Sequence, residues 1–291
     1  MIPIIFDGKA LAGEKEKVLA KRVEGFKTRT GITPKLVSFL VGDNPASKLY
    51  LRLKAEVAER VGIEFEKREF TPEAGLETIL ASVRQVNDDK SVHGIMIQLP
   101  LPKDLEIVPP LAGSRHGGRN WKLEILGAIA PRKDVDCLTP ENLGLLLMGE
   151  PRFLPATVRA ILTIAQGSRL KAQGSNAIIV GASNIVGKPL AIMLSTMGAT
   201  VTVCRSTTGN LSDFTKGADI LVSATGVPGL IKKEMIKRGA VVIDVGAPKP
   251  DVDPAVGEVA SFLTPVPGGV GPLTVISLLE NTLDAAERQT P

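Results

Sequence analysis

Four short apolar runs recur at regular intervals in the second half of the chain, and they constrain its fold more than any other feature. They are AIIVGA, TVTVC, DILVSA and AVVIDVGA, at 177–182, 200–204, 219–224 and 240–247. Helical segments separate them, as the crossovers between parallel strands require. This rhythm predicts a series of βαβ units, the core of a doubly wound, Rossmann-like parallel sheet that binds a nucleotide.

The first half of the chain alternates in the same way, less regularly. Its predicted strands lie near 35–41, 63–69 and 92–98, and its predicted helices near 10–28, 46–61 and 73–87. Further helices are predicted near 141–149, 155–166 and 273–288. The Pro-, Gly- and Arg-rich segment 109–120 has no periodicity and is predicted to be an exposed loop. The expected fold class is therefore α/β, with two α/β domains and a cleft between them.

Composition narrows the functional classes. Hydrophobic residues are 44% and charged residues 23%, as in an ordinary globular protein, and the net charge of +4 is small for 291 residues. Aromatic residues are 3%, too few for the stacking platforms that bind single-stranded nucleic acid. No apolar run approaches the ~18 residues of a membrane span, and the N-terminus lacks a secretory layout. We expect a cytoplasmic protein that acts on anionic small molecules and has no nucleic-acid or membrane partner.

Metal and disulfide chemistry is not expected. The cysteines and histidines are Cys137, Cys204, His93 and His116, and they are widely spaced in the sequence. They form neither a CxxC pair nor the clustered ligand pattern of a zinc site, so no metal is predicted.

The first apolar run leads into a glycine-containing turn, GASNIVGKP at 181–189. Gly181 permits a sharp turn after the strand, and Gly187 permits close packing of the next helix on the sheet. The first amides of that helix would face a pyrophosphate, whose charge the helix dipole favours. The spacing is G-x-S-x-x-x-G rather than G-x-G-x-x-G, so the prediction of dinucleotide binding depends on the surrounding βαβ series. By itself the turn could be purely structural.

The second apolar run ends at Cys204 and is followed by Arg205 and Ser206. In NAD-binding sheets an Asp or Glu in this region accepts a hydrogen bond from the ribose 2′-hydroxyl. A guanidinium fork instead matches a 2′-phosphate, so we predict NADP as the cofactor, with NAD as the alternative. A solvated loop arginine is the other interpretation of Arg205.

Polar side chains in the first half form a candidate catalytic group. Tyr50 and Lys54 are four residues apart, which places both on one face of a helix. Gln98 ends a predicted strand, at the edge where such sheets bind ligands, and the cluster KDVD follows at 133–136. The Y-x-x-x-K spacing alone is also typical of a solvated helix surface.

Together these segments resemble the bifunctional methylenetetrahydrofolate dehydrogenase/cyclohydrolase family over nearly the whole chain. Six segments in the family's order carry the resemblance: VGDNPASKLYLRLK (41–54), GIMIQLPLP (94–102), KDVD (133–136), GASNIVGKP (181–189), VVIDVGA (241–247) and TPVPGGVGPLTV (264–275). The expected domains are a folate-binding catalytic domain of 1–148 plus 273–291 and a dinucleotide-binding domain of 149–272.

The family's site residues carry over to matching positions. The resemblance implies that Lys54 is the key cyclohydrolase residue, that Gln98 hydrogen-bonds and tunes it, and that Tyr50 lies along the pterin ring. It implies that Asp136 binds the amide and amino edge of the pterin. The other implied substrate contacts are Leu99, Pro100, Pro267, Gly268 and Gly269. The implied cofactor contacts are Gly181, Ser183, Ile185, Gly187, Arg205, Ser206 and Thr274.

The resemblance implies an NADP-dependent oxidoreductase and hydrolase of one-carbon metabolism, with a part in tetrahydrofolate interconversion and purine biosynthesis. It would oxidise 5,10-methylenetetrahydrofolate to 5,10-methenyltetrahydrofolate and hydrolyse this to 10-formyltetrahydrofolate. The family also implies a homodimer. Two alternatives remain: a dehydrogenase only, using NAD or another pterin carrier, and a non-catalytic folate- or nucleotide-binding regulator.

Three features depart from the family pattern. Cys137 follows Asp136 at a position where the family usually has glycine. Ala182 replaces an arginine that many members use for the NADP phosphate, and Arg205, in place of a histidine, can compensate. The connection 109–128 is longer than in the family and is interpreted as a surface insertion. The alternative is a contact to an anionic substrate tail or a partner subunit.

Overall fold

The computed structural model describes residues 4–102, 120–167 and 171–290, and the chain divides into two compact units. Unit 1 comprises residues 1–15 and 145–277, and unit 2 comprises residues 16–144 and 278–291. These limits differ from the expected 1–148 plus 273–291 and 149–272 chiefly at the N-terminus. The reason is that β1 (Ile4–Ile5) pairs with β9 (Phe262–Leu263), which attaches the first residues to the sheet of unit 1.

Unit 1 is built on a six-stranded parallel sheet, which confirms the predicted doubly wound architecture. The four predicted strands are β5 (Asn176–Val180), β6 (Thr200–Cys204), β7 (Ile220–Ser223) and β8 (Val241–Asp244). Strand β7 is buried throughout, as expected for a parallel strand covered on both faces. Strands β1 and β9 were not predicted, because two residues are too few to show a pattern.

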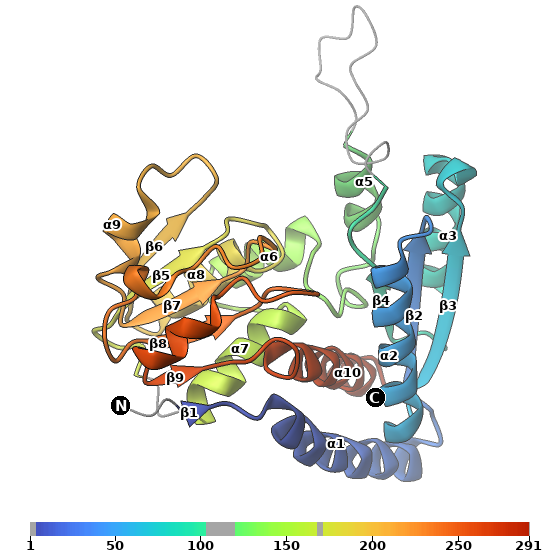
Figure 1. Ribbon diagram of the computed structural model, residues 1–291. Coiled ribbons are helices and arrows are strands. Elements are labelled where there is room, and N and C mark those ends of the chain that lie inside the picture. The colour runs from blue at the N-terminus through green and yellow to red at the C-terminus, as the bar shows by residue number, and fades with distance from the viewer. Residues whose placement is uncertain (1–3, 103–119, 168–170, 291) are drawn as a thin grey trace, which may run out of the picture. The chain divides into compact units, whose positions relative to one another are not determined.

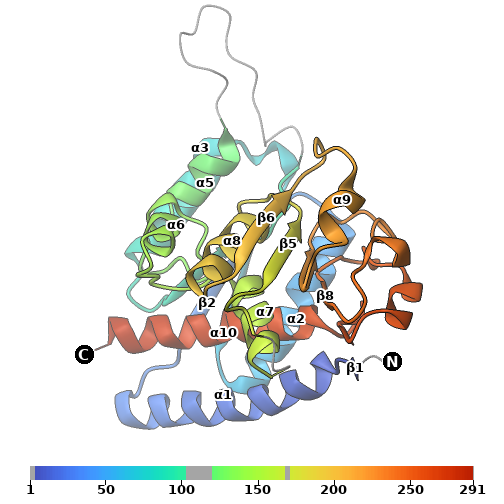
Figure 2. The ribbon, with the colours of Figure 1, turned by 90° about the vertical axis from the view of Figure 1, so that its left-hand side faces the viewer.

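Helices cover both faces of this sheet. Helix α8 (Gly187–Thr196) packs against β5 and β6, and α9 (Leu211–Thr215) lies on the opposite face (Figure 2). Helix α7 (Ala156–Gly167) precedes β5. Short 3-10 helices, Lys233–Met235 and Pro254–Glu258, lie before and after β8.

The order of the strands creates a switch point between β5 and β7. The full order is β1-β9-β8-β7-β5-β6, so the chain passes from β5 outward to β6 and then returns to β7 on the other side of β5 (Figure 1). In open α/β sheets, ligands bind beyond the carboxyl ends of the strands at such a point. The turns that follow β5 and β7 are therefore the expected walls of a ligand site.

Unit 2 contains a three-stranded parallel sheet in the order β3-β2-β4. Its strands β2 (Lys35–Val41), β3 (Glu64–Phe70) and β4 (Gly94–Ile97) lie where the sequence predicted them. Helices α2 (Pro45–Val61) and α3 (Leu76–Asp88) lie on opposite faces, as right-handed crossovers to the two sides of β2 require (Figure 1). A 3-10 turn, Pro72–Ala74, precedes α3.

Three further helices are α1 (Gly8–Thr30), α6 (Pro140–Leu147) and α10 (Val270–Gln289). Within unit 2, Arg22 of α1 forms ion pairs of 3.0 Å with Asp284 and Glu287 of α10. Asn281 Nδ2 donates a hydrogen bond of 2.7 Å to the carbonyl of Val135. These contacts attach the end of α10 to the sheet and helices of unit 2.

The described end of the connection 109–128, residues 120–128, contains a helix. Helix α5 (Trp121–Gly127) begins after Asn120, whose side chain accepts a hydrogen bond of 3.0 Å from the amide of Leu123. This helix lies just beyond the predicted loop 109–120 and was not predicted, because two turns of helix with a local cap show no long apolar periodicity. Residues 103–119, with Arg115, His116 and Arg119, lie outside the described residues.

Across the described ranges, no helix is long and apolar enough to cross a membrane. In the same residues, no three His, Cys, Asp or Glu side chains gather as metal ligands would.

Cys137 has a φ of 56°, and it is the single non-glycine residue with positive φ in the described part of the chain. Its side chain is fully buried. A left-handed backbone costs a residue with a Cβ about 1–2 kcal/mol, which gives glycine an advantage at this position. The cysteine therefore combines backbone strain with favourable side-chain burial.

We expect Cys137→Gly to have a free energy of unfolding about 1 kcal/mol higher than Cys137→Ala. Both variants remove the thiol, and only glycine removes the strain. Urea denaturation measures the difference. The control is Ala81→Gly at an exposed position in α3, where glycine is expected to cost about 1 kcal/mol. A Gly variant less stable than the Ala variant at position 137 would contradict the assignment of strain.

His93 is buried just before β4, with 3% of its surface exposed. Its Nδ1 accepts a hydrogen bond of 3.1 Å from the amide of Lys35. Burial lowers the pKa of His93, the charge of Lys133 lowers it further, and Asp89 opposes this shift. A protonated ring would lose the Lys35 hydrogen bond, so the native protein favours the neutral imidazole.

The stability of the native state should fall as the pH drops below about 6.5, where the unfolded chain protonates His93 and the folded chain resists. The expected loss is up to about 1.4 kcal/mol for each pH unit, the limit for one proton. Urea denaturation at about pH 7.5 and about pH 5.5 measures it. His93→Asn, which retains an acceptor for the Lys35 amide, should lose this slope. An equal slope in both proteins would assign the effect to other groups.

Candidate functional site

Helix α2 presents Tyr50 and Lys54 one turn apart on the same side. Its start is fixed by Asn44, whose side-chain oxygen accepts hydrogen bonds from the first two free amides at 2.9 and 3.1 Å. Its end is fixed by Gly62, which has a left-handed φ of 81°. Both side chains therefore project from a helix whose two ends are set locally by the sequence.

The ammonium of Lys54 is held by residues of β4 and the turn after it. Its Nζ donates a hydrogen bond of 2.9 Å to Gln98 Oε1 and lies 3.6 Å from Met96 Sδ. Gln98 is 8% exposed, and its Nε2 donates to the carbonyl of Leu99 at 2.9 Å. This second bond fixes the orientation of the amide, so its oxygen faces the lysine. The structure thus brings together Lys54 and Gln98, which are 44 residues apart.

Burial lowers the pKa of Lys54, and the negative charge of Asp136 opposes this shift. Met96 adds a weak sulfur acceptor and no charge. The amine therefore loses its proton more readily than a solvated lysine, which suits a group that exchanges protons during a reaction.

The two aspartates of KDVD have different surroundings. Asp134 is buried, and its carboxylate accepts hydrogen bonds from the amides of Leu138 and Thr139 at 3.0 and 2.8 Å. This pairing makes Asp134 a structural cap of the following turn. Asp136 is half-buried and acts electrostatically on Lys54. The second aspartate, which the sequence singled out, therefore lies close to the candidate catalytic amine.

In unit 1, the turn after β5 has little room for side chains. Gly181 has a φ of 118°, and a Cβ on Gly187 would lie 1.8 Å from the carbonyl oxygen of Gly181. Ser183 Oγ accepts a hydrogen bond of 3.1 Å from the amide of Val186, and Ile185 is half-buried in the same turn. The backbone of α8 begins immediately after this turn, with its first amides at the carboxyl edge of the sheet.

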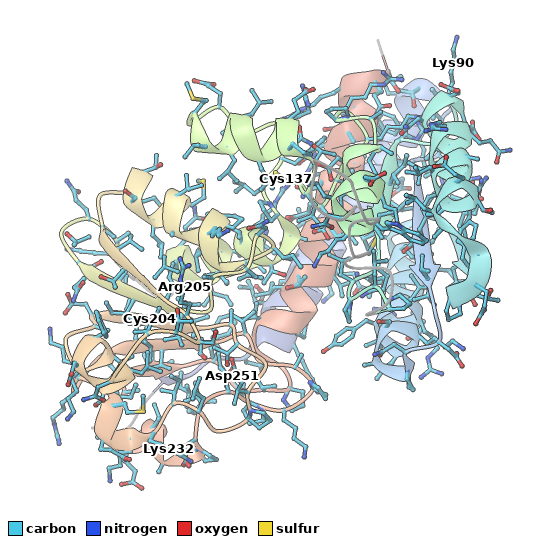
Figure 3. The ribbon with its side chains drawn as sticks, turned by 90° about the horizontal axis from the view of Figure 1, so that it is seen from above. Lys90, Cys137, Cys204, Arg205, Lys232 and Asp251 are labelled. Atoms are coloured by element: carbon cyan, nitrogen blue, oxygen red, sulfur yellow. The ribbon has the colours of Figure 1, made fainter. Side chains whose placement is uncertain are left out.

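Arg205 follows Cys204 at the end of β6 and is exposed (Figure 3). The turn is closed by a hydrogen bond of 2.9 Å from the amide of Arg205 to Thr208 Oγ1. Ser206 is also exposed. A cation and a hydroxyl at this strand end fit a phosphate, and the tight glycine turn beside them fits a pyrophosphate. The residues of unit 1 therefore fit NADP.

The segment 264–269 is a compact turn that leads into α10, and Thr274 lies in the first turns of that helix. Peptide bonds Leu99–Pro100, in unit 2, and Val266–Pro267, in this turn, are cis. Gly268 has a φ of 106°, and a Cβ on Gly269 would lie 2.6 Å from the carbonyl oxygen of Pro265. The hydroxyl of Thr274 donates to the carbonyl of Val270 at 3.2 Å. The backbone of this turn, rather than its side chains, is what a ligand would meet.

Sequence reasoning missed three residues near these sites. Met96 contacts Lys54, and the only signal for it was its place two residues before Gln98 in one strand, on the same face. Asp244 and Asp251 are buried carboxylates beside the turns after β7 and β8. Asp244 ends an apolar run, which was a signal. Asp251 lies in a Pro-rich loop and gave none.

Two family models match the chain. The one described as "Tetrahydrofolate dehydrogenase/cyclohydrolase, catalytic domain" matches residues 6–136, and the one described as the "NAD(P)-binding domain" of the same family matches residues 155–290.

The chain is also similar to curated proteins over nearly its full length. "Bifunctional protein FolD" of Methanosarcina barkeri is 43% identical, with 97% of this chain and 96% of that protein covered. The protein of the same name from Polynucleobacter asymbioticus is 44% identical, with coverage of 98% and 97%.

Solved structures agree. The bifunctional FolD methylenetetrahydrofolate dehydrogenase/cyclohydrolase of Campylobacter jejuni has a TM-score of 0.88 and 38% identity, covering 97% of this chain and 98% of that chain. The Trypanosoma brucei enzyme, solved with NADP and an inhibitor, has a TM-score of 0.90 and 34% identity, with 98% of each chain covered. With both of its halves matched and its fold shared, this chain belongs to the tetrahydrofolate dehydrogenase/cyclohydrolase family.

Proposed function

We propose that this protein oxidises 5,10-methylenetetrahydrofolate with NADP and then hydrolyses the 5,10-methenyl product to 10-formyltetrahydrofolate. The observation that carries the proposal is the side-chain amine of half-buried Lys54, held at 2.9 Å by an amide oxygen of fixed orientation. A dehydrogenase without hydrolase activity, or a regulator, would have no use for a lysine with a lowered pKa at this place. The alternatives are therefore not favoured.

In the first reaction the protein contributes by positioning the cofactor and the folate substrate. We assign the pyrophosphate to the turn of Gly181, Ser183 and Gly187 and the amides that begin α8, and the 2′-phosphate to Arg205 and Ser206. When bound, NADP supplies the hydride acceptor for the methylene carbon. The step needs no acid or base, so holding the cofactor and the substrate in place is the protein's contribution to catalysis.

In the second reaction a water molecule adds to the methenyl carbon, and a proton must leave that water. The neutral amine of Lys54 accepts this proton at Nζ, and the resulting ammonium can return it to the folate nitrogen when the ring opens. Gln98 holds Nζ in place through both stages, because its amide oxygen accepts from either form. The positive charge of the methenyl substrate would lower the pKa of Lys54 further.

The pterin is assigned to unit 2. Tyr50, on the same side of α2 as Lys54, offers a ring for stacking, and Asp136 offers a carboxylate to the amide and amino groups of the pterin. Leu99 and Pro100 border Gln98. The turn of Pro267, Gly268 and Gly269 is assigned to the nicotinamide end of the reaction, with Thr274 beside it. Unit 2 is thus the folate-binding unit and unit 1 the dinucleotide-binding unit.

Two further properties belong to the proposal. The protein is cytoplasmic, in keeping with a chain whose described helices include none that could span a membrane. It assembles as a homodimer, in keeping with its family, and a molecular mass of twice 30.7 kDa in light scattering would support this.

Lys54→Met should lower the rate of methenyltetrahydrofolate hydrolysis by about 100-fold or more, the usual range for loss of a positioned proton carrier. The NADP-dependent oxidation should stay within about threefold, since hydride transfer needs no base. Lys54→Arg should fail equally, because a guanidinium does not deprotonate. Both activities are followed by absorbance.

Lys48→Met is the matched control, since Lys48 is an exposed lysine of the same helix. Hydrolysis in Lys54→Met at the rate of this control would refute the assigned role of Lys54.

Arg205→Ala should raise the KM for NADP about tenfold or more, because a charge-assisted contact to the 2′-phosphate is lost. The KM for NAD, which has no such phosphate, should change by less than about twofold. Steady-state kinetics with both cofactors measures the contrast. Arg238→Ala, an exposed arginine of the same unit, is the control. Equal changes with NADP and NAD would show that Arg205 does not contact the phosphate.

A further inference from the structure

Asp251 is a fully buried carboxylate of unit 1 with an unusual set of partners. Its Oδ2 accepts hydrogen bonds from Ser223 Oγ at 2.9 Å, from the amide and hydroxyl of Thr225 at 2.7 and 2.8 Å, and from the amide of Gly226 at 3.3 Å. Its Oδ1 is buried and has no hydrogen-bond partner among the described residues. All of its donors therefore come from one short segment, 223–226.

That segment is the turn after β7, at the switch point of the sheet. A Cβ on Gly181, the first residue of the turn after β5, would lie 2.3 Å from the carbonyl oxygen of Ala224. The two turns are thus in direct contact, and any shift of Ala224 or Thr225 would disturb the glycine turn assigned to the dinucleotide. Asp251 itself lies in the interior of unit 1, away from its periphery (Figure 3).

The backbone of Asp251 is held by a second buried carboxylate, that of Asp244. Its amide donates to Asp244 Oδ1 at 3.2 Å, and that carboxylate also accepts from the amides of Gly246 and Val252 at 2.8 and 3.0 Å. A Cβ on Gly246 would lie 2.7 Å from Asp251 Oδ1, so the carboxylate fills a space that only glycine leaves open.

The two aspartates differ in what they anchor. Asp244 binds amides of the loop that follows its own strand. Asp251 reaches from that loop to the turn of the neighbouring strand and binds it through four donors. The cost of burying a carboxylate with one unpaired oxygen is substantial. Asp251 is therefore placed to fix a turn more than to stabilise the unit.

We infer that Asp251 is a positioning residue for the dehydrogenase reaction, which acts through Thr225 to fix the 223–226 turn against the dinucleotide site. The inference rests on the proposed function. Thr225 Oγ1 donates a hydrogen bond to Asp251 and accepts one of 3.1 Å from the amide of Val227. The hydroxyl therefore links the buried carboxylate to Val227, which is exposed at the end of the turn. Hydride transfer is sensitive to displacements of about 1 Å, so loosening this turn lowers cofactor affinity and rate.

The test separates the two activities in one protein. Thr225→Val, which removes the hydroxyl at nearly constant shape, should raise the KM for NADP about fivefold or more. Asp251→Asn should have the same effect, larger. The rate of hydrolysis of methenyltetrahydrofolate, supplied directly and without NADP, should stay within about twofold of the unaltered protein in both variants. The midpoint of thermal unfolding of Thr225→Val should stay within a few degrees of that of the unaltered protein. Thr225→Ser, which keeps the hydroxyl, should restore the KM.

Asp253→Asn is the matched control. Asp253 is a partly exposed aspartate two residues further along that caps the 3-10 helix Pro254–Glu258 and pairs with Lys232 at 3.1 Å, with Lys232 at the edge of the unit (Figure 3). This variant should change neither activity. If Asp251→Asn fails to fold, Thr225→Val and Thr225→Ser decide the matter.

Two results would overturn the inference: a KM for NADP within about twofold in Thr225→Val, or a parallel fall of both activities, which would make the contact merely structural. Failure of the proposed function is distinguishable, since the unaltered protein would then show no activity. In that case calorimetric titration with NADP judges the inference, and equal affinity of the unaltered protein and Thr225→Val would overturn it.

Discussion

A lysine partly withdrawn from water needs hydrogen-bond acceptors or loses its proton more readily, and the candidate site in unit 2 depends on how Lys54 meets this constraint. Lys54 has one strong neutral acceptor, Gln98, and a weak one, Met96. A carboxylate in direct contact would have kept the lysine charged, whereas an amide holds it in either state. Three local features position the two partners of this hydrogen bond. The capped helix α2 carries Lys54, strand β4 beside β2 leads directly to Gln98, and the carbonyl of Leu99 orients the amide of Gln98.

In unit 1 the candidate ligand site is formed mainly by backbone rather than by side chains. Its ligand edge consists of turns after parallel strands, and turns are held only as well as their amides are satisfied. Gly181 brings the turn after β5 against the turn after β7, Gly187 brings the start of α8 against Gly181, and two buried aspartates supply the missing acceptors. Burial raises the pKa of Asp244, and the nearby charge of Asp251 raises it further, while three backbone amides hold it down.

Departures from the family pattern have local physical explanations. Cys137 occupies a left-handed backbone position beside Asp136. The backbone strain at this position is offset by burial of the cysteine side chain, next to a candidate site residue. Arg205 places a cation where the strand beside the glycine turn ends, which suits a chain that has Ala182 rather than arginine in the turn itself.

The sequence by itself determined the α/β class, the parallel strands β5 to β8 and the strands β2 to β4, because apolar periodicity and turn residues act locally. The candidate residues Lys54, Gln98 and Arg205 came from their places in motifs and at strand ends and from the family resemblance. Only the tertiary structure decided that β1 joins β9, that Met96 flanks Lys54, and that Asp251 anchors the turn after β7. Such contacts join residues far apart in sequence or in elements too short for periodicity, and they depend on register and packing that no local pattern encodes.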